Sequence, residues 1–99
     1  MLGIPAELIA PVRARVAAKL AREPVEDLRI DFEDGYGRRA DAEEDAAATA
    51  AGAVLGAARA ARTAPPFAGL RCKSLEADTR ARAVRTLDLF LEAYLAAGG

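Results

Sequence analysis

The sequence of 99 residues contains no histidine and no tryptophan, and it has one cysteine, Cys72. The absence of histidine removes imidazole from any catalytic or metal-binding scheme that the chain could support. A single cysteine forms no disulfide bond within the chain, which is typical of proteins from reducing compartments. We therefore expect a cytoplasmic protein in which Cys72 is a small buried apolar residue rather than a nucleophile.

The sequence also lacks a strong net charge and a long apolar segment. Its 14 basic and 15 acidic residues give a formal net charge of -1, so electrostatics give no reason to expect nucleic acid or an anionic membrane surface as a partner. No apolar run approaches the roughly 20 residues of a membrane helix, and the first residues lack the pattern of a secretory signal. The length is that of one small domain.

Apolar periodicity and turn residues predict five elements in the order helix, strand, helix, strand, helix, at residues 11–22, 28–33, 41–62, 67–73 and 75–95. In the first helix, Val12, Val16 and Leu20 share one face. Pro11 is expected in the first turn, where its missing N–H has no intrahelical partner. A helix between two strands makes the strands parallel, with a right-handed crossover. The predicted fold class is therefore α/β, with about two parallel strands and three helices.

An acidic run opens the predicted helix 41–62. Asp41 and Glu44 match the D-x-x-E start signal, with Asp41 as the N-cap residue. Acids near a helix N-terminus also complement the helix dipole. The sequence therefore assigns Asp41, Glu43, Glu44 and Asp45 to a helix start rather than to a binding site.

The two predicted strands each carry one charged face. Residues 28–37 read LRIDFEDGYG, in which apolar and charged side chains alternate up to a loop with two glycines. Asp31 and Glu33 share the charged face of the first strand, and Arg71 and Lys73 share that of the second. Parallel strands that are covered on both faces are near-continuous apolar runs. This alternation leaves two interpretations, a solvated face with ion pairs between the strands or the wall of a site at their carboxyl ends.

Three stretches carry a resemblance to an enzyme superfamily: RIDFEDGYG, the DAEED that follows it, and GLRCKSLEADTRARAVRTLDLFL. The D-x-E-D motif at the end of one strand and the arginine in the next resemble the citrate lyase β-subunit and HpcH/HpaI aldolase superfamily, in particular a bacterial aldolase-like branch. The resemblance implies a TIM-type (β/α)8 barrel. Such a barrel needs about 250 residues, so the chain is expected to be a fragment that contributes about two of the eight strands.

The resemblance implies a Mg²⁺-dependent lyase or aldolase that cleaves or forms carbon–carbon bonds in small carboxylate or CoA-thioester substrates. By the same resemblance, Arg71, Glu33 and Asp34 correspond to catalytic positions, and Arg71, Asp31 and Lys73 to substrate-binding positions. The superfamily's metal ligands come from later strands. This chain is therefore expected to supply no metal ligand and to be active only as part of a complete barrel.

The residues leave three alternatives open. Arg71 either holds a substrate carboxylate with paired N–H donors or forms a plain ion pair with Asp31 or Glu33. Lys73 serves either as a Schiff-base amine or as a structurally paired cation or phosphate contact. The chain as a whole is either an enzyme segment or a non-catalytic α/β association module that pairs its open strand edges with itself or with another chain.

Overall fold

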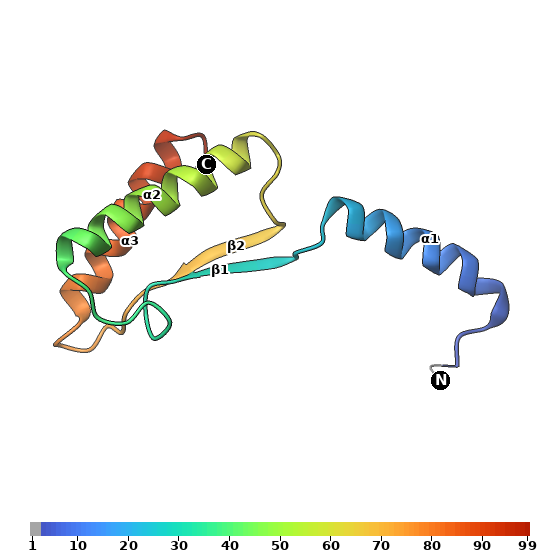
Figure 1. Ribbon diagram of the computed structural model, residues 1–99, viewed down its shortest axis with the longest axis horizontal. Helices are drawn as coiled ribbons and strands as arrows, with labels where there is room; N and C mark the ends of the chain where they lie inside the picture. Colours follow the sequence, from blue (N-terminus) through green and yellow to red (C-terminus); the bar gives the residue numbers. More distant parts are fainter. Residues whose placement is uncertain (1–2) are drawn as a thin grey trace.

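The helices and strands follow one another in the predicted order (Figure 1). The computed structural model describes residues 3–99. The elements in this range are α1 (Ala6–Arg22), β1 (Asp27–Asp31), α2 (Asp41–Ala60), β2 (Phe67–Arg71) and α3 (Arg80–Ala96). The prediction of an α/β fold with three helices and two parallel strands is confirmed for the described residues. No helix among them is long and apolar enough to span a lipid bilayer.

β1 and β2 form a two-stranded parallel sheet in which Ile30 pairs with Leu70 and Asp31 with Arg71. Neighbouring residues of a strand point to opposite faces. Ile30 faces α2, with which it lines an apolar hollow, so Asp31 and Arg71 lie on the opposite face. Both α2 and α3 lie over the apolar face, and no helix within residues 3–99 covers the charged face (Figure 1).

The core lies between α2 and α3. A Cβ at Gly52 would lie 2.2 Å from the carbonyl oxygen of Phe90, and one at Gly56 would lie 2.3 Å from that of Tyr94. The two glycines therefore allow the backbones of the helices to approach each other closely. Phe90 of α3 and Phe32, which follows β1, are almost fully buried.

α1 lies apart from the other elements (Figure 1). None of its residues is buried, and its apolar side chains are 39–53% exposed, namely Leu8, Ile9, Val12, Val16 and Leu20. The radius of gyration is 18.5 Å, whereas a compact domain of about 100 residues has a value of about 13 Å. The apolar face predicted for the first helix is therefore present but largely uncovered.

The helix starts differ from the predicted ones. α1 begins at Ala6 instead of residue 11, so Pro11 lies inside the helix rather than in its first turn. Proline at this position removes one backbone hydrogen bond from the helix. The predicted N-cap at Asp41 is wrong, because Ala40 occupies the N-cap position and no side chain caps α2. α2 also ends at Ala60 rather than at residue 62.

The two strands end earlier than predicted, and α3 begins later. β1 and β2 end at Asp31 and Arg71 instead of residues 33 and 73, because the chain turns into a loop at Asp31. α3 begins at Arg80 instead of residue 75. In the loop before it, the Thr79 hydroxyl donates a hydrogen bond of 2.8 Å to the carbonyl oxygen of Ser74. Such local bonds between side chain and backbone compete with helix formation.

Candidate functional site at the strand ends

Asp31, the last residue of β1, shapes the loop that follows the strand. Its two carboxylate oxygens accept hydrogen bonds from the backbone N–H groups of Glu33, at 2.7 Å, and Gly35, at 2.8 Å. A Cβ at residue 35 would lie 2.4 Å from the Asp31 carboxylate, so a larger residue there would displace this side chain from its hydrogen bonds. The hydrogen bond from the Glu33 N–H is the largest influence on the pKa of Asp31 and lowers it below its ordinary value. Partial burial raises the pKa, whereas the Gly35 N–H and the positive charge of Arg71 lower it further.

Arg71, the last residue of β2, is held beside this loop. Its Nε donates a hydrogen bond of 2.7 Å to Glu33, and its Nη2 lies 3.9 Å from a carboxylate oxygen of Asp34. The hydrogen bond to Glu33, followed by the negative charge of Glu33, raises the pKa of Arg71. The Arg71 side chain remains 58% exposed. Among the described residues, no acceptor lies within hydrogen-bonding distance of its two terminal nitrogens.

Lys73 lies apart from Arg71, on the side of α2. Its ammonium donates hydrogen bonds to the carbonyl oxygen of Phe32 at 2.8 Å and to the carboxylate of Glu44 at 2.5 Å. The ammonium also lies 5.4 Å from the centre of the Tyr36 ring. The Lys73 side chain is only 13% exposed. These contacts are those of a cation paired with a carboxylate.

Glu44 is the carboxylate at the centre of this second cluster and is 1% exposed. Besides Lys73, it accepts a hydrogen bond from the hydroxyl of Thr86 and lies 3.0 Å from Nε of Arg82. Burial raises the pKa of Glu44, but the hydrogen bonds from Lys73 and Thr86 and the two positive charges outweigh burial and lower it overall. Glu44 therefore stays ionised in the core, where a buried charge requires such partners.

The buried cluster extends to Asp45, which binds Arg82 and Arg85 of α3. Hydrogen bonds from Arg82, and then from Arg85, lower the pKa of Asp45 despite some burial. Together these contacts join the first turn of α2 to α3 and, through Lys73, to the end of β2. They fix the position of the strand end that carries Arg71.

Two groups of charged residues therefore stand at the strand ends. The structure brings Asp31, Glu33, Asp34 and Arg71 together on the uncovered side and places Lys73 in the other group. Sequence analysis missed Glu44, which it assigned to the helix start. The signal that could have found it is its position on the same face of α2 as the buried residues Ala48 and Leu55,.

The donor set of the uncovered group does not fit a Mg²⁺ site. Both oxygens of Asp31 accept backbone hydrogen bonds, and Glu33 accepts from Arg71, which leaves Asp34 as the one carboxylate in this group free of hydrogen bonds among the described residues. A magnesium ion is usually held by one or two carboxylates in an octahedral arrangement completed by water. No group of three potential ligands occurs in residues 3–99.

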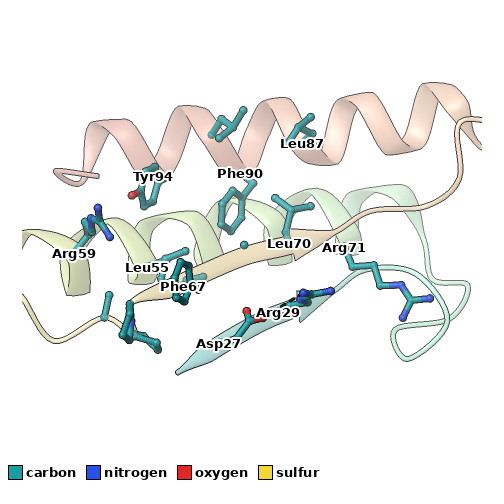
Figure 2. Close-up of a pocket in the computed structure, with 16 residues that line it drawn as sticks. Asp27, Arg29, Leu55, Arg59, Phe67, Leu70, Arg71, Leu87, Phe90 and Tyr94 are labelled. Atoms are coloured by element: carbon teal, nitrogen blue, oxygen red, sulfur yellow. Dashed lines mark hydrogen bonds and ion pairs between the residues drawn. The ribbon is translucent and has the colours of Figure 1, made fainter. Parts of the chain in front are cut away.

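A hollow of about 910 Å³ runs from Arg71 along β2 and beneath α3 (Figure 2). Leu70 of β2 and Leu87, Phe90 and Tyr94 of α3 line it (Figure 2). Asp27 and Arg29 of β1 also line it. Its lining is largely aliphatic and aromatic, so it provides apolar contact area next to the guanidinium at its end.

A family model described as a domain of unknown function, DUF6986, matches residues 1–99. No curated protein and no solved structure matches the chain.

Proposed function

The chain belongs to the DUF6986 family, and we propose that it is the segment of a carbon–carbon lyase or aldolase that binds the carboxylate of a small substrate. The substrate class is a short carboxylate or a CoA thioester, as the resemblance to the citrate lyase β-subunit and HpcH/HpaI aldolase superfamily implies. The chain alone is proposed to bind but not to turn over such a substrate. A cytoplasmic location forms part of the proposal and rests on the single cysteine.

The observation that carries the proposal is the state of Arg71. Its guanidinium is fixed through Nε by Glu33; among residues 3–99 neither terminal nitrogen makes a hydrogen bond, and Nη2 lies 3.9 Å from Asp34. A carboxylate can accept two parallel hydrogen bonds from these nitrogens, an arrangement that is strong and directional. The ammonium group of lysine is not planar and has no pair of parallel N–H donors, so lysine cannot form this two-bond arrangement.

The position of Arg71 supports the same proposal. It ends β2, and Glu33 follows the end of the parallel neighbour β1. In a TIM-type barrel the active site lies at the carboxyl ends of the strands, with the helices outside. Both α2 and α3 lie on the same face of the sheet (Figure 1), so the opposite, charged face has the orientation of an inner barrel wall. We propose the barrel on this ground.

Magnesium enters the proposal with one restriction. Because Asp31 and Glu33 are engaged in hydrogen bonds, the metal ligands are proposed to come from outside the described residues. A bound magnesium ion would act as a Lewis acid on an enolate-like oxygen of the substrate. The described residues contribute the carboxylate clamp at Arg71 and the loop that fixes it.

Isothermal titration of the chain with pyruvate, a minimal 2-oxo acid, tests the clamp. We expect the wild-type chain to bind and the Arg71→Lys variant to bind at least about tenfold more weakly, the factor that corresponds to a loss of about 1.4 kcal/mol. The matched control is Arg29→Lys, because Arg29 lies on the same sheet face and pairs with a neighbouring acid, Asp27, at 3.2 Å. Equal affinities of wild type and Arg71→Lys, or no binding by either, contradict the proposal.

A second candidate function is association without catalysis. The specific observation in its favour is the exposure of apolar side chains beside the open edges of the sheet, such as Val54 at 70% and Leu91 at 44%. Apolar side chains that are exposed together are typical of interaction surfaces.

A further inference from the structure

The peptide unit between Phe32 and Glu33 is held at both of its polar ends. Its carbonyl oxygen, on Phe32, accepts a hydrogen bond of 2.8 Å from the ammonium of Lys73. Its N–H, on Glu33, donates a hydrogen bond of 2.7 Å to the carboxylate of Asp31. Because a peptide unit is planar, it cannot rotate without breaking one of these two bonds. Two side chains therefore fix the direction in which Glu33 leaves the backbone.

Glu33 in turn decides where the guanidinium of Arg71 lies. The Glu33 carboxylate accepts a hydrogen bond of 2.7 Å from Nε of Arg71, and the Arg71 side chain is otherwise 58% exposed. The backbone adds a second link, because the N–H of Phe32 donates a hydrogen bond of 2.8 Å to the carbonyl oxygen of Arg71. Residues 32 and 33 therefore hold Arg71 by its backbone and by its side chain.

Lys73 can hold this peptide because its other contact is buried. The ammonium of Lys73 donates a hydrogen bond of 2.5 Å to Glu44 of α2, which is 1% exposed. The Lys73 side chain itself is 13% exposed, and hydrogen bonds that are shielded from water are stronger than exposed ones. A continuous series of hydrogen bonds therefore leads from the first turn of α2, through Lys73, to the peptide that directs Glu33.

We propose that Lys73 is the positioning residue of the Arg71 clamp. It holds the peptide so that the Glu33 carboxylate takes Nε of Arg71, which leaves the two terminal nitrogens for the substrate carboxylate. The register of the strands does not supply this arrangement. The partner of Arg71 in the register is Asp31, and both carboxylate oxygens of Asp31 are bonded to the backbone of the loop. The role in substrate binding rests on the proposed function, whereas the position of Arg71 in the free chain does not.

The Nε–H signal of Arg71 in ¹H–¹⁵N spectra of the ligand-free chain tests the positioning. The Lys73→Met variant removes the ammonium and keeps a long unbranched side chain. The Glu33→Gln variant supplies the signal of an Arg71 without its carboxylate partner. We expect the signal in Lys73→Met to move from its wild-type position toward its position in Glu33→Gln. An Arg71 signal that stays at its wild-type position in a folded Lys73→Met chain overturns the proposal.

The Gly52→Ala variant is the matched control for a general loss of stability. Its new Cβ would lie 2.2 Å from the carbonyl oxygen of Phe90, so the substitution acts on the contact between α2 and α3. We expect it to lower the free energy of unfolding and to leave the Nε–H signal of Arg71 in place. A shift in Gly52→Ala as large as that in Lys73→Met overturns the proposal, because any loosening of the fold would then move Arg71.

A measurement on the wild-type chain decides the case in which Lys73→Met does not fold. The chain has two lysines, Lys19 and Lys73, and Lys19 pairs with Glu26 but is 31% exposed. We expect the ammonium of Lys73 to exchange its protons with water more slowly than that of Lys19. We also expect a scalar coupling between Nζ of Lys73 and the carbonyl carbon of Phe32. Equal exchange rates, or no such coupling, overturn the proposal.

Titration with pyruvate separates this proposal from the proposed function. A clamp that is not held in place must be immobilised on binding. We therefore expect Lys73→Met to bind pyruvate about 2- to 13-fold more weakly than wild type, which corresponds to about 0.5–1.5 kcal/mol. If the Arg71 signal moves in Lys73→Met but wild type binds no pyruvate, the positioning stands and the substrate clamp fails. If both chains bind pyruvate equally and the Arg71 signal does not move, the clamp stands and the positioning fails.

Discussion

Replacing Glu44 by glutamine should destabilise the fold more than any other change of a single charge in the first turn of α2. Glu44 is 1% exposed and receives contacts from Lys73, Thr86 and Arg82. Glutamine has nearly the same shape and keeps one acceptor oxygen, so the variant removes the negative charge with little change in packing. Lys73 and Arg82, whose side chains are each 13% exposed, then lose their shared partner.

The magnitude follows from what each cation retains. Breaking a buried ion pair costs about 3–5 kcal/mol, because the remaining charge stays buried. Lys73 keeps its hydrogen bond to the carbonyl oxygen of Phe32, and Arg82 keeps Asp45. We therefore expect the lower end, about 3 kcal/mol of unfolding free energy. In a domain of this size, each kcal/mol lowers the midpoint of thermal unfolding by about 4–8 °C.

Urea denaturation at pH 7, followed by circular dichroism, measures this loss. The matched control is Glu43→Gln in the preceding position, because Glu43 is exposed and pairs only with Arg39, at 3.5 Å. An exposed pair of this kind contributes about 0–1 kcal/mol. If both variants unfold at the same urea concentration, the buried cluster does not hold α2, α3 and the strand end together, and the reasoning is refuted.

Three further predictions concern the pH, the glycine contact and α1. Folding lowers the pKa of Glu44 from 4.5, so the stability that the ionised carboxylate contributes is complete above pH 4.5 and is lost on acidification. The free energy of unfolding should therefore fall below about pH 4.5, and it should fall less steeply in the Glu44→Gln variant. Equal slopes of unfolding free energy against pH in the two proteins would contradict this. Gly52→Ala should destabilise the fold by about 1–3 kcal/mol through overpacking, because the new Cβ would lie 2.2 Å from the carbonyl oxygen of Phe90. Gly69→Ala is the control and should not destabilise the fold in this way, because its Cβ would have no neighbour within 4 Å. Urea denaturation measures both variants. Backbone amides of α1 should exchange with deuterium much faster than those of α2, since α1 has no buried residue,; equal protection would show that α1 is packed.

Local patterns were sufficient to predict the order of the elements and the parallel pairing. The alternation in residues 28–33 and the placement of a helix between the strands depend on neighbours in sequence. The same local patterns missed the role of Glu44. An acid near a helix start resembles a capping residue, and only the packing of α2 on α3 shows that this one is buried against Lys73 and Thr86.

Local patterns also did not predict the contacts of Lys73 or the residue at which α3 begins. The alternation predicted a strand that continues through Lys73, but β2 ends at Arg71. Lys73 then contacts Glu44 of α2, 29 positions away, and Phe32 in the loop after β1, 41 positions away. α3 begins at Arg80 because residues 74–79 bond to one another. By contrast, the sequence predicted an acidic neighbour for Arg71 and left Asp31 and Glu33 open; in the structure Asp31 is its partner in the strand register and Glu33 forms its ion pair.

The central claim is that the free terminal nitrogens of Arg71 bind a substrate carboxylate. The most direct measurement follows the Nε–H signal of Arg71 in ¹H–¹⁵N spectra during titration with pyruvate, with the Nε–H signal of Arg29 as the internal reference. We predict that the Arg71 signal shifts and saturates while the Arg29 signal stays in place. An Arg71 signal that does not move, or that moves only in step with Arg29, would contradict the account.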